Sequence, residues 1–264
     1  MTTYILAAAA VAVILVLIRY PFWRPARTGV TVLAYHHVGV PPKNSKLKRN
    51  WVSPQAFARQ MDYVVSQGFT TLTLDDLAKI SEGKADMPAK PLLITFDDGY
   101  KNNYLNALPI LKERNLKANI FFVYDAIGHH NMWHAPAKET WQDMMTVEQI
   151  KEVLAGKNIG YGSHTLTHKN LDRIAAADAK YEIEESKFRL EALLGTQCTS
   201  FTYTYRGGKN AEINKIIKEA GYKFAFSMYN GINTPPFNAD KPLNRIFIKR
   251  CHNMWDFKIK LNRR

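Results

Sequence analysis

Two short segments carry side chains that together could bind a metal ion and move a proton. "TFDDGY" contains adjacent carboxylates, Asp97 and Asp98, and "SHTLTH" contains two histidines four residues apart, His164 and His168. Residues at i and i+4 lie about 6 Å apart on a helical turn and about 13 Å apart on an extended strand. The two histidines can therefore share one ion only if the chain turns between them.

The chemistry that these residue types favour is metal-assisted hydrolysis. Two histidines and one carboxylate make a set of ligands that leaves coordination positions open for water and substrate. Adjacent residues leaving a strand point in different directions, so the second carboxylate can face the bound water. A cation also lowers the cost of holding two like charges together. The alternative is an Asp-Gly turn and two surface histidines in a polar loop.

The elements that must position these residues follow an alternating pattern. Apolar runs typical of strands alternate with amphipathic runs typical of helices, which predicts a parallel α/β domain. Strands are expected at 30–35, 91–96, 118–123, 158–162, 200–203, 223–228 and 243–248, and helices at 54–67, 101–114, 146–155, 176–194 and 210–220. Both candidate segments follow a predicted strand, and the carboxyl ends of parallel strands converge on one crevice.

Composition limits the other classes of function. The chain has 264 residues, of which 46% are hydrophobic, enough for one large domain with a sizeable core. Two isolated cysteines, Cys198 and Cys251, exclude a disulfide framework and a cysteine zinc site. The net charge of +13 would attract phosphate, anionic lipid or acidic glycan. Nucleic acid, which also carries phosphate, is the least favoured partner, because the cations are dispersed along the sequence and no known nucleic-acid-binding motif is present.

The N-terminus carries an uncharged apolar run at residues 4–18. It is short for a span of about 20 residues. It would suffice if Arg19 reached the membrane surface and the aromatic residues after it lay in the interface. We expect one transmembrane helix, with residues 1–27 as membrane anchor and basic, aromatic interfacial segment and 28–264 as the catalytic domain. A cleaved signal peptide is the competing interpretation, but the basic start and small-residue cleavage site are missing.

This anchor predicts a single-pass protein of the bacterial cytoplasmic (inner) membrane, in the cell envelope, with membrane lipid as a partner. Arg19, Arg24 and Arg27 follow the apolar run and no Lys or Arg precedes it. That bias favours a cytoplasmic domain, but it rests on three residues, and the side of the membrane stays open.

Several motifs resemble one known family. "TFDDGY" and "SHTLTH" resemble the first two motifs of the polysaccharide deacetylases, carbohydrate esterase family 4 with the NodB-homology domain. "YHHV" at 35–38, residues 51–77 and "EIEESKFRLEALLG" at 182–195 resemble the subgroup that includes poly-N-acetylglucosamine deacetylases. The resemblance covers most of residues 30–248 and implies a distorted (β/α) barrel.

The resemblance also implies roles for the four residues. Asp98, His164 and His168 would hold a divalent metal, with Zn²⁺ first and Co²⁺, Ni²⁺ or Fe²⁺ as alternatives, and Asp97 would be the general base. A bound metal lowers the pKa of its water and polarises the acetamide carbonyl.

A third motif is altered in this chain. "SFTYTYRGGKN" has Thr204 and Arg206 where the subgroup has proline and glycine. Tyr205 is the expected backbone donor to the oxyanion. Arg206 could tune Asp97, contact an acidic substrate, or be a solvated loop cation.

The general acid is not evident, because the Leu-x-x-His motif that many relatives use is missing. His134 and His252 are the candidates. Tyr100, Trp133 and Tyr203 are expected to bind substrate, and His36 and His37, after the first strand, could reach the same crevice.

The predicted function is removal of the N-acetyl group from N-acetylhexosamine residues in a polysaccharide or lipid-linked glycan. One alternative is a deacetylase or deformylase acting on a polyprenyl-phosphate-linked or lipopolysaccharide-precursor amino sugar at the cytoplasmic face. The other is a glycan-binding module that kept the fold and lost turnover.

Overall fold

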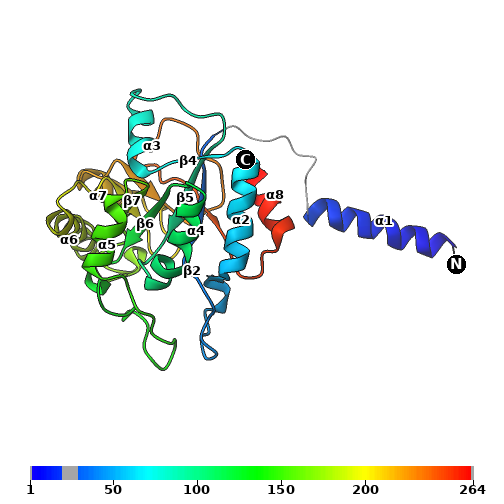
Figure 1. Ribbon diagram of the computed structural model, residues 1–264, viewed down its shortest axis with the longest axis horizontal. Coiled ribbons are helices and arrows are strands. Elements are labelled where there is room, and N and C mark those ends of the chain that lie inside the picture. Colours follow the sequence, from blue (N-terminus) through cyan, green and yellow to red (C-terminus); the bar gives the residue numbers. More distant parts are fainter. Residues whose placement is uncertain (1, 20–28, 263–264) are drawn as a thin grey trace.

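The computed structural model describes residues 2–19 and 29–262. Residues 29–262 contain a curled, parallel main sheet with helices packed around it, whereas the N-terminal helix stands apart from them (Figure 1). The helices are α1 (Thr2–Arg19), α2 (Pro54–Ser66), α3 (Leu74–Ser81), α4 (Leu108–Glu113), α5 (Val147–Ala155), α6 (Ala176–Leu194), α7 (Ala211–Glu219) and α8 (Met254–Asn262). The strands are β1 (Thr31–Tyr35), β2 (His37–Val38), β3 (Trp51–Val52), β4 (Thr70–Thr71), β5 (Pro91–Phe96), β6 (Ala118–Phe122), β7 (Ile159–Ser163), β8 (Ser200–Thr202), β9 (Phe224–Phe226) and β10 (Ile246–Phe247). Short helical turns lie at Lys48–Asn50, Asn103–Ala107, Tyr124–Ala126 and Leu171–Arg173.

The main sheet has the strand order β10-β1-β5-β6-β7-β8-β9, and all of these pairs are parallel. β4 pairs with the start of β5, and β2 and β3 form a separate pair. The segment before β10 also reaches the far end of the sheet, because Leu243 N–H donates to Ala225 O at 2.7 Å and Leu243 O accepts from Ser227 N–H at 2.8 Å. The sheet therefore curls into a distorted barrel in which all strands point the same way.

Burial on both faces explains the continuous apolar runs of the central strands. Every residue of β1 and β5 is buried. Leu33 packs on the outer side with α2 residues such as Phe57, whereas its neighbour Val32 packs inside with Phe121 and Phe226. Alternate side chains of one strand thus serve the helical layer and the barrel interior.

Local signals set the helix boundaries that the sequence predicts well. α2 begins at Pro54, directly after the N-cap Ser53, whose hydroxyl accepts the N–H of Ala56 at 3.2 Å. The predicted seven strands and five helices all correspond to observed elements. The predicted helix 101–114 is divided into a wide turn and α4. The prediction omitted α3 and α8, as well as the short strands β2, β3 and β4.

The expected transmembrane helix is not supported. Across the two described ranges, none of the helices is both long and apolar enough to cross a membrane. α1 has 18 residues, which at 1.5 Å per residue gives a length of about 27 Å, less than a hydrocarbon core of about 30 Å. The expected interfacial segment at 20–27 lies outside the described residues. The boundary at residue 28 stays a prediction.

Candidate metal centre and active site

The candidate site lies at the carboxyl ends of the parallel strands. Asp97 and Asp98 follow β5, and His164 follows β7 directly. Asp97 N–H donates to Tyr35 O of β1 at 2.9 Å, and His164 N–H donates to Phe122 O of β6 at 2.8 Å. Backbone pairing with the neighbouring strands therefore fixes where both candidate segments leave the sheet.

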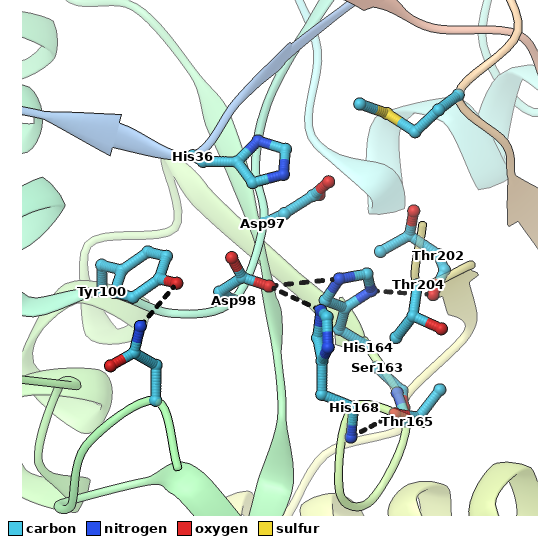
Figure 2. A network of polar contacts seen from close by, with 12 residues as sticks. His36, Asp97, Asp98, Tyr100, Ser163, His164, Thr165, His168, Thr202 and Thr204 are labelled. Atoms are coloured by element: carbon cyan, nitrogen blue, oxygen red, sulfur yellow. Dashed lines mark hydrogen bonds and ion pairs between the residues drawn. The ribbon is translucent and has the colours of Figure 1, made fainter. Parts of the chain in front are cut away.

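Three side chains converge in the way the spacing required. Asp98 Oδ1 lies 3.2 Å from His164 Nε2 and 3.3 Å from His168 Nε2, and Figure 2 shows both imidazoles directed at this carboxylate. The turn between the histidines has left-handed backbone at Thr165 (φ 72°) and at His168 (φ 64°). This turn brings His164 and His168 to one side, so the three residues can hold one ion.

The proton positions at His164 are compatible with a bound cation. His164 Nδ1 lies 3.0 Å from the carbonyl oxygen of Thr202, which can only accept, so Nδ1 carries the proton. The lone pair of Nε2 then faces Asp98 Oδ1, and this oxygen has no hydrogen-bond donor within the described chain. In the metal-free protein burial raises the pKa of Asp98, but the two imidazoles, when they carry a proton on Nε2, hold it well below its usual value. An ionised carboxylate opposite an imidazole lone pair fits a divalent metal, with Thr202 orienting the ligand.

Asp97 is held by a buried arginine. Arg245 Nη1 and Nη2 donate to the two oxygens of Asp97 at 2.6 and 2.8 Å, and the arginine is 0% exposed. Arg245 also donates to Ser227 O at 3.1 Å and to Thr95 Oγ1 at 3.3 Å. Burial raises the pKa of Asp97, but the charges of Arg245, His164 and His36 and the hydrogen bonds from Arg245 together outweigh it, so the pKa lies below its usual value. Asp97 is therefore an ionised carboxylate with a fixed orientation.

Arg245 is the main residue that the sequence analysis missed. It directly precedes β10, in the apolar run "LNRIFI". An arginine inside such a run requires a buried acidic partner, and that signal could have identified it. Arg206, which we considered for tuning Asp97, is instead exposed, and its guanidinium lies 5.3 Å from the centre of the Tyr229 ring.

The three candidate metal ligands and Asp97 form the floor of a cleft of about 590 Å³. The expected site residues that line it are Tyr100, Trp133, His134, Tyr203, Tyr205 and Arg206, together with His36. The Trp133 ring stacks on His168 at 4.4 Å, and the Tyr205 ring lies 5.4 Å from His168. The Tyr203 hydroxyl is bonded to Asn214, so only part of this side chain can face the cleft.

The two candidates for the general acid are placed differently. His134 lines the cleft beside Trp133. His252 is not among the lining residues of the described chain, and its Nδ1 accepts the backbone N–H of Lys249 at 3.0 Å. His36 also lines the cleft, close to Asp97 in Figure 2. The roles of these histidines, of Tyr205 and of the expected substrate-binding residues stay predictions.

Glu182 of α6 secures the turn that carries His168. Its Oε2 accepts the N–H groups of Leu166 and Thr167 at 3.1 and 2.8 Å, and its Oε1 accepts the Thr167 hydroxyl. The side chain is 3% exposed. The motif "EIEES" thus has a structural reason, since its first glutamate fixes the loop between the two histidines.

Comparison with known proteins identifies the family. The chain belongs to the polysaccharide deacetylase family, whose model matches residues 84–225, more than half of its length. Members of this family are carbohydrate esterases that act on the amide bonds of N-acetylated sugars, so this protein belongs to a family of hydrolases.

Relatives and a solved structure agree with this assignment. YxkH of Bacillus subtilis (strain 168), whose name describes it provisionally as a polysaccharide deacetylase, is 29% identical over 218 residues, or 83% of this chain and 68% of that protein. The poly-beta-1,6-N-acetyl-D-glucosamine N-deacetylase of Staphylococcus aureus (strain MRSA252) is 26% identical over 213 residues, which cover 78% of this chain and 70% of that protein. The crystal structure of BC0361, a polysaccharide deacetylase from Bacillus cereus, superposes with a TM-score of 0.73 at 25% identity, covering 89% of this chain and 69% of the other.

Proposed function

We propose that the protein is a metal-dependent N-deacetylase that hydrolyses the acetamide of N-acetylhexosamine residues in a polysaccharide. The observation that carries this proposal is the Asp98, His164 and His168 cluster beside an Asp97 fixed by Arg245. The cluster offers three metal ligands and leaves coordination positions open for water and substrate. Asp97 offers an oriented carboxylate at the end of the same strand as Asp98. The S. aureus relative, named for its action on poly-N-acetylglucosamine, supports the choice of a polymer.

The roles of the residues follow from their positions. A divalent metal on these three ligands would supply a water of lowered pKa and would polarise the acetamide carbonyl. Asp97, as general base, takes the proton from the attacking water, and Arg245 keeps the carboxylate oriented while it does so. Tyr205 has left-handed backbone (φ 58°) at the cleft wall, and its N–H is the proposed donor to the oxyanion. His134 is the better placed of the two proposed acids for protonating the leaving amine.

Acetate release from β-linked N-acetylglucosamine oligomers tests the proposal. Turnover should disappear after treatment with a chelator and return with added Zn²⁺. Asp97→Asn should keep the metal but lower kcat by at least about 100-fold, because it removes the base and leaves the ligands in place. Asp98→Asn should instead lose metal, which elemental analysis would show.

The same assay separates the remaining alternatives. Release of formate from N-formyl oligomers in preference to acetate would identify a deformylase. Metal-loaded protein that binds oligomers but releases no acyl group from any of them, lipid-linked sugars included, would contradict the proposal and favour a glycan-binding module.

A further inference from the structure

The walls of the cleft carry one sign of charge. Arg49, Arg206, Lys249 and Lys260 all line the cleft, and the acidic lining residues are Asp97 and Asp98 on its floor. The four cations come from separate parts of the chain: the turn before β3, the loop after β8, the segment after β10, and α8. Folding therefore gathers charges that are dispersed in the sequence.

Three of these cations have no acidic partner in the described part of the chain. Arg49 and Arg206 are exposed and Lys249 is half-buried, and none of the three forms an ion pair with a described carboxylate. Arg206 lies over the Tyr229 ring at 5.3 Å and Lys249 over the Phe247 ring at 5.8 Å. An aromatic face holds a cation in place without neutralising it, so its N–H groups stay available to a ligand.

The carboxylates of the floor do not cancel this charge. Asp97 is neutralised by Arg245 through two hydrogen bonds. Asp98 is directed at the two histidines, and the divalent ion that fits there would exceed its charge. A substrate entering the cleft thus meets a positive field above the metal site.

This field suits some N-acetylated glycans better than others. A neutral polymer of N-acetylglucosamine offers only hydroxyl and acetamide groups, and each acetyl group removed from it leaves an ammonium that the cleft would repel. A carboxylate or phosphate beside the target sugar would instead be attracted, and arginine binds both through paired hydrogen bonds.

We propose that the cleft selects an anionic glycan, in which a carboxylate or phosphodiester next to the N-acetylhexosamine is bound by Arg49, Arg206 and Lys249. This inference rests on the proposed function, since it names the substrate class of the same site. The shared chemistry is a negative charge on or beside the reacting sugar, from either a uronic acid or a phosphodiester.

The test compares three oligosaccharides of similar length: neutral chitopentaose, a hyaluronan hexasaccharide with alternating carboxylates, and an N-acetylglucosamine oligomer joined by 1-phosphodiesters. We expect kcat/KM to be at least about tenfold higher on an anionic probe than on chitopentaose, and the advantage to shrink at high salt. The anionic probe with the larger advantage identifies the source of the charge.

Matched variants test whether the higher kcat/KM on anionic probes depends on the cations of the cleft. The triple variant Arg49→Gln, Arg206→Gln, Lys249→Gln should lower the ratio of anionic to neutral kcat/KM on the order of tenfold. The control is Lys84→Gln, Lys180→Gln, Lys215→Gln, which removes the same net charge from exposed positions outside the cleft and should leave the ratio unchanged. Thermal melting confirms that both variants are folded.

The outcomes separate the two proposals. Equal or faster turnover of chitopentaose, or an anionic advantage that the cleft variant retains, would overturn the inference while leaving the deacetylase intact. Isothermal titration calorimetry measures binding of the same oligosaccharides and covers the case in which no turnover is seen. If no probe releases acetate but the anionic oligomers bind in a salt-dependent way that only the cleft variant loses, the activity is wrong and the cleft assignment stands. Absence of both turnover and binding contradicts both.

Discussion

At the scale of single residues, the two adjacent aspartates of the candidate site have different surroundings, which suit the different roles proposed for them. Asp98 faces two histidines and Asp97 faces a guanidinium, so the two like charges have separate partners. Left-handed backbone at Asp98 (φ 73°) turns the chain between them and directs the side chains apart. The Asp-Gly pair does form a turn, as the alternative interpretation expected. This turn directs the two carboxylates to different partners.

Replacement of Arg245 tests the orientation of Asp97. Arg245→Met leaves a buried carboxylate unpaired, so we expect the free energy of unfolding to fall by about 3–5 kcal/mol. We also expect kcat to fall about 100-fold, because the base loses its fixed position. Arg245→Lys should recover part of both losses, since it restores the charge but not the two parallel hydrogen bonds.

Metal content distinguishes positioning from loss of the metal. Both variants should bind zinc like the wild type if they remain folded, because Arg245 contacts none of the three ligands. Arg114→Met, which removes a surface guanidinium paired with Asp62, is the control. A kcat of Arg245→Met close to that of this control would show that the buried ion pair has no part in the reaction.

At the scale of elements, helix α6 acts on the site through one side chain. It packs outside the sheet, and its Glu182 reaches the loop that follows β7. Three hydrogen bonds to Leu166 and Thr167 fix a loop whose backbone is left-handed at two positions. A loop of that shape needs support from elsewhere in the structure, because left-handed backbone is unfavourable for residues other than glycine.

Glu182→Gln is expected to loosen this loop. An amide nitrogen cannot accept the hydrogen bonds that a carboxylate oxygen accepts, so His168 should be held less firmly. We expect zinc affinity, measured by competition with a chromogenic chelator, to fall about 10- to 100-fold. Glu184→Gln, on the exposed side of the same helix, should have no effect. Equal zinc affinities of the two variants would contradict the role given to Glu182.

At the scale of the whole molecule, the barrel buries a second histidine that the sequence placed near the site. His37 is 5% exposed, and its ring lies between Trp51 at 4.1 Å and Tyr100 at 3.7 Å. Its Nδ1 lies 2.9 Å from the amide nitrogen of Asn102, which donates to it. Burial lowers the pKa of His37 to about 3, although the charge of Asp98 acts in the opposite direction.

This buried imidazole makes global stability depend on pH. The unfolded chain takes up the proton near pH 6.5, whereas the folded chain does so only near pH 3, so protonation favours unfolding between these values. As the pH falls through this range, the metal-free wild type should lose up to about 1.4 kcal/mol of unfolding free energy per pH unit more than His37→Phe does. Urea denaturation of both proteins across the range measures the difference. Parallel curves would show that His37 is not the titrating group.

The sequence by itself singled out the four residues proposed as metal ligands and general base, the strands that carry them and the family, because these depend on local pattern and short spacing. The tertiary structure alone decided the partner of Asp97, since Arg245 lies 148 residues away and meets it only where the segment before β10 joins both ends of the curled sheet. It also decided the charge of the cleft, because Arg49 and Lys249 are unremarkable in a chain with 36 basic residues until folding brings them beside Arg206, which stands out in the sequence only as a motif departure. Contacts between distant segments depend on how the barrel closes, and no local pattern in the sequence specifies that.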